Sequence, residues 1–136
     1  SQSSAMLIEL SNFYSKLSKQ QDQWMTVHGI SFREFLIMHH LSNSSARNMR
    51  RIDLAVKIGL SASGVTRMLN PMEKVGIVGK EENARDARVS LVALTDAGEE
   101  MYRNAVKTLN QRSKLFISSL DENKRAALAQ LTSGAS

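Results

Sequence analysis

The segment KIGLSASGVTRML, residues 57–69, has four small residues in a row where a helix is expected to begin. Small side chains there let the helix N-terminus approach a bulky partner, and its free N–H groups favour a phosphate. Thr66 and Arg67 follow, and a hydroxyl group and a guanidinium can bind base edges or phosphates. The residue types and their spacing therefore indicate binding of a nucleic-acid duplex.

The expected helix covers residues 62–75, and the serine before it is the expected N-cap. Val65, Leu69 and Met72 recur at the spacing of a buried face. The residues predicted to contact DNA lie at the start of the helix and on its opposite face: Ser61, Ser63, Gly64, Thr66, Arg67 and Asn70. The alternative is that Ser61 only caps the helix and that Gly64 only allows close packing.

Two β-prone segments, GIVGKEE and RVSLVALT, flank the polar tip ENARDA and predict a β-hairpin. Arg85, Asp86 and Arg88 lie at this tip. A long cation there can enter a DNA minor groove, and Asp86 can hydrogen-bond to Arg88 and orient it. The alternative is an ordinary exposed ion pair, which contributes little to stability. Because the hairpin follows the polar-faced helix expected over residues 62–75, a DNA-binding wing is the favoured interpretation.

The net charge of +5 is concentrated in the middle of the chain. Residues 47–88 contain nine Lys and Arg against five Asp and Glu, whereas the flanking parts are nearly balanced. A local basic surface favours phosphate, because each neutralised phosphate releases counterions. The same charge also fits a solvated basic face, so it supports nucleic-acid binding without requiring it.

Further helices are predicted around this central part. Residues 5–27 have the apolar periodicity of an amphipathic helix, and Ser31 predicts a capping box at the start of the next one. Residues 42–50, SNSSARNMR, are predicted to be a polar connector. Thr95 and Asp121 are expected to cap the last two helices.

A short helix at residues 52–58 is expected just before the polar-faced helix. Ala55 supplies a small residue where the two helices cross, and Gly59 allows the positive φ of a tight turn. Pro71, inside the second helix, predicts a kink near residues 67–70. The expected fold is therefore mainly α with a small β-hairpin wing, a winged helix-turn-helix built from four helices, two strands and two further helices.

Several kinds of chemistry are not expected from this composition. The chain has no Cys, which removes disulfides, thiol catalysis and Cys-based zinc sites. We find no glycine-rich phosphate loop, metal-ligand cluster or nucleophile with a placed base, so we expect no enzyme, cofactor or metal site. No apolar run approaches the roughly 20 residues of a membrane span, and a cytoplasmic location is the expectation.

Two segments, LAVKIGLSASGVTRMLNPMEKVGIV and ENARDARVSLVALTDAG, resemble the MarR family of transcriptional regulators. In that family a helix-turn-helix, Leu-Glu-Lys-x-Gly, a wing with Asp-x-Arg, and Leu-Thr-x-x-Gly follow in this order. Here the last three correspond to residues 72–76, 86–88 and 94–98. Lys80 lies where an Arg is frequent, so it is expected to take over a phosphate contact, and Asn83 replaces a common Asp.

The resemblance implies a single domain over residues 1–136 that forms a homodimer. Residues 5–30 and 100–132 would hold the dimerisation helices, and residues 47–95 would form the winged helix-turn-helix lobe. Two copies would then read a pseudo-palindromic operator in double-stranded DNA, most often as a repressor.

The family also implies release by a small aromatic or anionic effector, bound between the dimerisation helices and the DNA-binding lobe. Phe13, Tyr14, Trp24 and His39 are candidates to line that pocket, and core or dimer contacts are the alternative role for the aromatic residues. A second hypothesis is a winged-helix module that binds protein instead of DNA. Such a module would need neither the wing Arg nor the basic middle of the chain, and its binding would tolerate salt.

Overall fold

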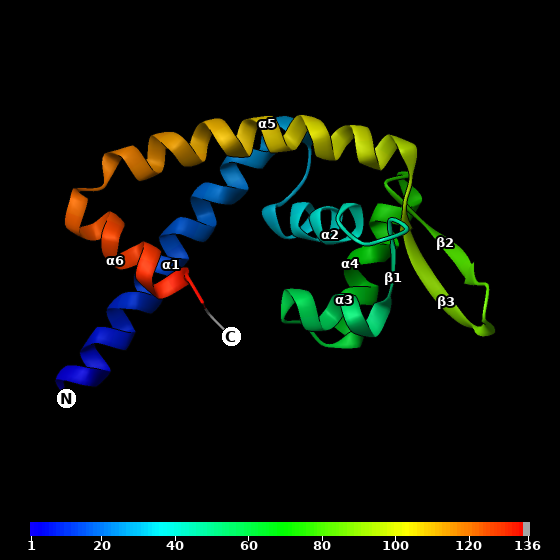
Figure 1. The fold of residues 1–136 in the computed structure, drawn as a ribbon, viewed down its shortest axis with the longest axis horizontal. Coiled ribbons are helices and arrows are strands. Elements are labelled where there is room, and N and C mark those ends of the chain that lie inside the picture. Colours follow the sequence, from blue (N-terminus) through cyan, green and yellow to red (C-terminus); the bar gives the residue numbers. More distant parts are fainter. Residues whose placement is uncertain (135–136) are drawn as a thin grey trace.

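The computed structural model describes residues 1–134, which form helices around a small antiparallel sheet (Figure 1). The predicted domain end at residue 136 lies outside the described residues. In chain order the elements are α1 (Gln2–Met25), the 3-10 helix η1 (Thr26–His28), α2 (Phe32–Ser42), β1 (Asn48–Arg50), α3 (Arg51–Ile58), α4 (Ala62–Lys74), β2 (Val78–Asn83), β3 (Asp86–Leu94), α5 (Asp96–Ser119) and α6 (Glu122–Thr132). The predicted fold, mainly α with a small β wing, is confirmed.

Side-chain caps set where the helices begin. The Ser31 hydroxyl accepts from the Glu34 N–H at 3.0 Å, and the Glu34 carboxylate accepts from the Ser31 N–H at 2.8 Å, which confirms the predicted capping box. Ser61, Thr95 and Asp121 cap α4, α5 and α6 through the N–H group three residues further on. Each cap satisfies a donor that the helix leaves free, so these boundaries follow from local chemistry.

The turn between α3 and α4 depends on Gly59, whose φ of 70° lies in the left-handed region. The N–H groups of Gly59 and Leu60 both donate to the carbonyl oxygen of Ala55, which is buried. Helix α4 continues through Pro71, because the Val75 N–H donates to the Pro71 carbonyl at 3.2 Å. The kink expected from Pro71 stays a prediction.

The sheet has three antiparallel strands in the order β1-β3-β2, where the sequence predicted only the β2–β3 hairpin. The expectation of a polar connector over residues 42–50 is therefore wrong for its last three residues, which form β1. Residues Asn48 to Arg50 pair with Ala93 to Leu91 of β3. A strand this short has no periodic signature, and its pairing depends on a segment more than forty residues away.

The core lies where α2, α3 and α4 meet the sheet and the first half of α5. Its largest fully buried side chains come from α1, α2, α3, α4 and β3: Met25, Ile37, Met38, Leu41, Leu54, Val65, Leu69, Met72 and Val92. Val65, Leu69 and Met72 of α4 are at most 1% exposed, as their spacing predicts. The helix-turn-helix and the wing thus share one core.

Helix α5 spans the molecule, from the base of the wing to the far end where the chain turns into α6 (Figure 1). The N-terminal part of α1 leads away from the lobe formed by α2, α3, α4 and the wing. Its apolar side chains are exposed, with Met6 at 68%, Leu7 at 65% and Leu10 at 53%. Among residues 1–134, no helix combines the length and apolarity that crossing a membrane requires.

A close contact at Gly98 joins α5 to the segment before the wing. The Thr95 N–H donates to the Ile77 carbonyl at 3.1 Å, and the Thr95 hydroxyl accepts from the Gly98 N–H at 3.0 Å. A Cβ on Gly98 would overlap the Ile77 carbonyl oxygen and lie 2.8 Å from Cδ1 of Leu94. The backbone carbonyl cannot yield without disturbing the hydrogen bonds of Thr95.

We therefore expect Gly98→Ala to lower the free energy of unfolding by about 1–3 kcal/mol, as overpacking does. The gain in helix propensity, about 1 kcal/mol, opposes this loss but is smaller. Urea unfolding followed by circular dichroism measures the difference. Gly79→Ala is the matched control, since its Cβ would meet nothing nearer than Cγ2 of Thr95 at 3.9 Å. Equal unfolding midpoints for the two variants would show that the close contact at Gly98 does not destabilise the Gly98→Ala protein.

Candidate nucleic-acid interface

Helix α4 presents one buried and one open face. Opposite the buried apolar side chains, Ser63, Arg67 and Asn70 are exposed and Thr66 is half-buried. The open face therefore offers hydroxyl, guanidinium and amide groups, which can bind base edges in a DNA major groove. The division into two faces agrees with the sequence, and contact with DNA stays a prediction for each of these residues.

At the start of α4, the N-cap residue Ser61 contacts other residues of the first helical turn. The Ser61 hydroxyl accepts from the Gly64 N–H at 3.1 Å and lies 3.1 Å from the Ser63 hydroxyl. A Cβ on Gly64 would lie 3.2 Å from Oγ of Ser61, which is tight. The capping role of Ser61 and the packing role of Gly64, which were alternatives at the level of the sequence, are thus both observed. Neither role prevents contact with a phosphate, because this end of the helix is open to solvent.

Arg51, the first residue of α3, is a polar neighbour of α4 that the sequence analysis missed. Its Nη1 donates to the Thr66 hydroxyl at 3.3 Å. A cation at the first position of a helix is unfavourable against the helix dipole, which was the one signal available in the sequence. The contact joins the two helices of the helix-turn-helix through their polar sides.

The tip of the wing holds an ordered pair between Asp86 and Arg88. The Arg88 guanidinium donates to both carboxylate oxygens, at 3.0 and 3.2 Å, and the Arg88 backbone N–H donates at 3.0 Å. These side-chain and backbone hydrogen bonds hold the pKa of the Asp86 carboxyl below its ordinary value. The predicted pairing is thus present in the structure. Because the Arg88 side chain is 91% exposed, the pair orients it more than it stabilises the fold.

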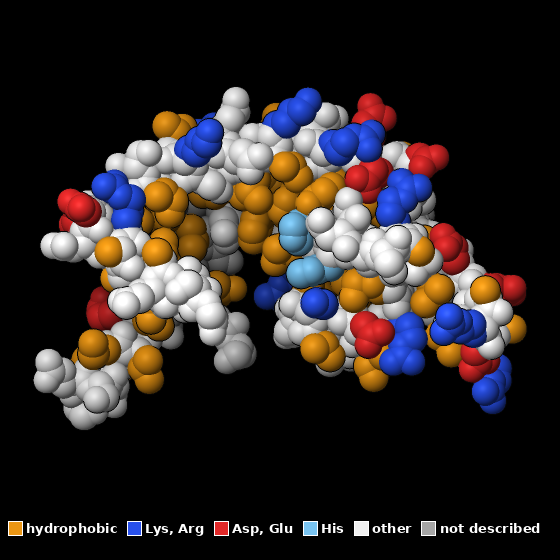
Figure 2. Space-filling model, in the orientation of Figure 1, with side chains coloured by type: hydrophobic (Ala, Val, Ile, Leu, Met, Phe, Trp, Pro, Cys, Tyr) orange, Lys and Arg blue, Asp and Glu red, His pale blue; other side chains and the backbone are white. Residues whose placement is uncertain are grey.

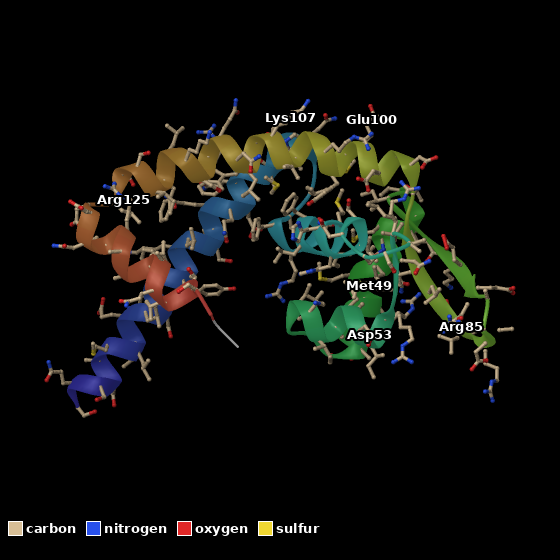
Figure 3. The ribbon with its side chains drawn as sticks, in the orientation of Figure 1. Met49, Asp53, Arg85, Glu100, Lys107 and Arg125 are labelled. Carbon is tan, nitrogen blue, oxygen red and sulfur yellow. The ribbon has the colours of Figure 1, made fainter. Side chains whose placement is uncertain are left out.

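Two further parts of the wing extend the basic surface. Arg85 points outward from the tip (Figure 3), while its backbone N–H donates to the Asn83 side chain at 2.9 Å. Lys80 of β2 is exposed and lines an open depression of about 440 Å³ with Asn70, Glu73 and Lys74 of α4. This depression lies between the candidate reading helix and the wing, where a DNA backbone would pass.

Basic and acidic side chains mingle on the face that holds α3 and the wing (Figure 2). Arg50 is paired with Asp53 at 3.2 Å and Arg47 with Asp96 at 3.2 Å. Within residues 1–134, no ion pair is found for Arg51, Arg67 or Arg85. Their charge is therefore available to a polyanion.

The residues predicted to line an effector pocket fall into two separate groups. Phe13 and Trp24 both pack against Phe116, with ring centroids 6.5 and 6.4 Å from it. His39 belongs to a second aromatic group, because its Nδ1 lies 2.7 Å from the Tyr102 hydroxyl. A single pocket formed by Phe13, Trp24 and His39 is therefore not supported.

A cleft of about 320 Å³ does lie between α1 and the lobe formed by α2, α3, α4 and the wing. Tyr14, which the sequence placed among the candidates, lines it together with Phe32 and Arg33 of α2. The other lining residues are Leu17, Ser18, Gln21, Asp22, Leu36 and Ile58. The cleft thus combines aromatic walls with an exposed cation, Arg33, and an exposed carboxylate, Asp22, which accepts from the Phe32 N–H at 2.8 Å. Arg33 was missed because nothing in the local sequence indicates which face of α2 meets α1.

Two of the three histidines form pairs with hydroxyl groups. His28 Nε2 lies 2.7 Å from the Thr108 hydroxyl, just as His39 Nδ1 lies 2.7 Å from the Tyr102 hydroxyl. Burial, followed by the charges of His39 and Lys57, lowers the pKa of His40. Within the described chain, no group of three or more His, Asp and Glu side chains is placed to hold a metal ion.

A two-helix turn, a hairpin wing and an exposed polar helix face define a winged helix-turn-helix protein. Residues 16–105 match the family model described as transcriptional regulator SarA/Rot. The chain belongs to this family, whose members are transcriptional regulators, and its resemblance to the MarR-family winged helix is confirmed.

Three known proteins illustrate the similarity. The uncharacterized HTH-type transcriptional regulator YdgJ of Bacillus subtilis is 29% identical over 83 residues, which are 61% of this chain and 51% of YdgJ. The transcriptional repressor MprA of Escherichia coli is 24% identical over 118 residues, covering 87% of this chain and 67% of MprA. The chain thus spans about half the length of the first relative and two thirds of the second.

The third is a solved structure, that of Sco3205, a MarR family transcriptional regulator from Streptomyces coelicolor, in complex with DNA. It is 22% identical, with a TM-score of 0.79, and the match covers 93% of this chain and 81% of Sco3205. At this level of identity the similarity establishes the fold.

Proposed function

We propose that this protein is a DNA-binding transcriptional regulator that reads a pseudo-palindromic operator as a homodimer. The observation that carries the proposal is the open face of α4, which lies beside a wing whose Arg88 is held in place by Asp86. Membership of the SarA/Rot regulators and the DNA complex of the similarly folded Sco3205 support it.

In this proposal α4 enters the major groove and the wing reaches the adjacent minor groove. Arg67 lies on the exposed side of α4 and can bind a guanine edge or a phosphate. Arg88 and Arg85 lie at the wing tip, where a minor groove offers its strong negative potential. Lys80 and Lys74 flank the depression between them, so the DNA backbone has cations along its path.

We expect Arg67→Ala to lower affinity and to blur the preference for one base pair in each half-site, because it removes a base contact worth about 1–3 kcal/mol. Arg88→Ala should weaken binding to all sequences and leave the subunits associated. Fluorescence-anisotropy titrations of a duplex selected from a random pool, and of duplexes changed at single base pairs, measure the loss of affinity and the loss of base preference.

Lys107→Ala is the matched control for this titration. Lys107 is an exposed cation on the outer side of α5, away from the wing (Figure 3), and its removal should change affinity little. If Arg88→Ala bound like Lys107→Ala, the wing would have no part in binding. Affinity for DNA should also fall steeply with salt, whereas a winged helix that binds a protein would keep its affinity.

The homodimer is proposed from the apolar residues that α1 leaves exposed. Six of them face solvent in the single chain: Met6, Leu7, Ile8, Leu10, Phe13 and Tyr14. Leu115 and Leu131, in α5 and α6, are also exposed, at 64% and 72%. This many exposed apolar side chains on α1, α5 and α6 favour an interface, and a second copy offers the same side chains in return.

These surfaces lie within residues 5–30 and 100–132, which we propose as the dimerisation helices of a single domain. Residues 47–95 would form its DNA-binding lobe. Two lobes held by one dimer would place their α4 helices one turn of DNA apart, as a symmetric operator requires.

Leu7→Glu should convert the dimer to a monomer, because it would bury charge in the apolar interface. Sedimentation velocity at several protein concentrations measures the change, and circular dichroism should show an unchanged helical content. Val75→Glu serves as the control, since Val75 is 72% exposed on the lobe and outside the proposed interface. A Leu7→Glu protein that sediments like wild type would place the interface elsewhere.

Regulation by a small anion is the third part of the proposal. The cleft beside Tyr14 and Arg33 lies between α1 and the lobe, so a ligand there would alter the angle between dimer and reading heads. Action as a repressor is proposed with it, in line with the similarity to MprA, which is described as a repressor.

Benzoate, used as a simple aromatic anion, should release DNA from the wild-type protein. Arg33→Gln should weaken this release by roughly tenfold or more, since it removes a charge-assisted hydrogen bond of about 1.5–3 kcal/mol. Anisotropy of the preformed complex against benzoate concentration gives both curves, and Arg112→Gln, on α5, is the control. Equal release from wild type and Arg33→Gln would remove this cleft from the proposal.

A further inference from the structure

The greater part of α5 carries positive charge that no acid of the same stretch balances. Residues 101–120 contain four Lys and Arg and no Asp or Glu, whereas residues 96–100 contain three acids. Cations near the end of a helix can offset the helix dipole, but this effect is confined to the last turn. The last turn of α5 has no basic residue, so the dipole does not account for this charge.

Three of these cations lie on one side of the helix together with an amide. The four residues recur at spacings of four, three and four, and we call them the α5 strip: Arg103, Lys107, Asn110 and Lys114. All four are exposed, whereas Ala105, on the opposite side of α5, is fully buried. Figure 2 shows Lys and Arg side chains along the outer edge formed by α5, and in Figure 3 Lys107 points outward from this edge.

Most of the charge on the α5 strip is not neutralised by the chain itself. Among residues 1–134, no ion pair is found for Lys107 or Lys114. Arg103 lies 3.9 Å from the Glu99 carboxylate, and its side chain remains 62% exposed. The same carboxylate oxygen of Glu99 accepts from the Ser42 hydroxyl of α2 at the shorter distance of 2.9 Å. The strip is therefore open to an anionic partner.

The α5 strip is separate from the surface proposed to read the operator. Helix α2 packs against α5 on one side and against α3 on the other, so the helix-turn-helix lies across α2 from the strip (Figure 1). Glu100 adds an exposed acid between the strip and the wing. A duplex of about 20 base pairs is far shorter than the DNA persistence length of about 150 base pairs, so one such duplex cannot bend from α4 round to α5.

The chemistry of the α5 strip fits the phosphates of a nucleic-acid duplex. The strip contains no apolar side chain, whereas a protein interface has an apolar centre and a helix lying on a membrane has an apolar face. At a rise of 1.5 Å per residue the strip is about 16 Å long. A duplex carries roughly ten phosphate charges over that length, at one per 1.7 Å of its axis.

The proposed dimer leaves room for this contact. Leu115, which we assign to the dimer interface, follows Lys114 in the helix and therefore points about 100° away from it. Pairing through Leu115 and the apolar side chains of α1 does not require burial of the α5 strip.

We propose that the α5 strip binds a second DNA duplex through its phosphates, while α4 and the wing hold the operator. The contact is independent of sequence, because phosphate contacts carry no direct information about the bases. One dimer thereby joins two segments of DNA. This inference rests on the proposed function for the first duplex and adds a second DNA contact to it.

Binding of the second duplex is measured after the reading surface has been filled. The dimer is mixed with one equivalent of unlabelled operator of about 20 base pairs, and a labelled duplex of unrelated sequence is then titrated and followed by fluorescence anisotropy. Lys107→Glu/Lys114→Glu should bind the labelled duplex about tenfold more weakly or worse, because two attractive charges become repulsive. Its affinity for the operator alone should stay close to that of wild type.

Lys16→Glu/Lys19→Glu is the matched control, since it changes the net charge equally at two exposed lysines of α1. This control should bind the labelled duplex like wild type. Lys107→Gln/Lys114→Gln removes charge without adding any, and should lower the slope of log affinity against log salt by about two, at about 0.9 for each phosphate contact. Circular dichroism should show the same helical content for all variants, because the changed side chains are exposed.

The outcomes separate this inference from the proposed function. An equal loss in Lys16→Glu/Lys19→Glu would make net charge the cause and overturn the α5 strip. A wild-type operator complex that binds no second duplex would overturn it too, as would phosphatidylserine vesicles that bind through Lys107 and Lys114 where DNA does not. A protein that binds no operator would instead refute the proposed function. The labelled duplex, titrated without operator, would then still show whether its binding depends on Lys107 and Lys114.

Discussion

The anchoring of α4 by Val65, Leu69 and Met72 is the interaction on which the rest of the structure depends. The three side chains are at most 1% exposed, and burial of each contributes about 1.5–3 kcal/mol. Turning α4 about its axis would lose that contribution, so the polar face cannot rotate inward. The helix therefore combines a fixed orientation with freely available polar groups, and the small residues at its start allow a close approach.

A second constraint joins the wing to the long helix. Thr95 directly follows β3 and caps the start of α5. Its N–H donates to the Ile77 carbonyl, and its hydroxyl accepts from the Gly98 N–H. Because α5 continues without interruption from Asp96 to Ser119, a tilt at its far end moves the wing base as well. The same helix thus links the proposed dimerisation region to the wing, which would be the physical basis for the proposed ligand-dependent spacing of the two lobes.

Local chemistry explains which features the sequence could predict. The caps at Ser31 and Ser61 depend on residues three positions apart, and the buried face of α4 follows from its spacing, so both were accessible. Strand β1 and the contact of Arg51 with Thr66 depend on pairings across the fold, which no local pattern contains. His39 of α2 was grouped too readily with Phe13 and Trp24 of α1, because side-chain type does not tell which neighbouring helix each will meet.

The exposed apolar stripe of α1 has a consequence for how such a regulator would respond to its own abundance. Under the proposed pairing, the monomer leaves this apolar surface exposed to solvent, so dimer formation depends on the concentration of the chain. At low copy number the fraction of occupied sites would rise with roughly the square of the chain concentration, since two chains must meet before one site is filled. A gene under such control would switch within a narrow range of expression, without any added cooperativity between sites.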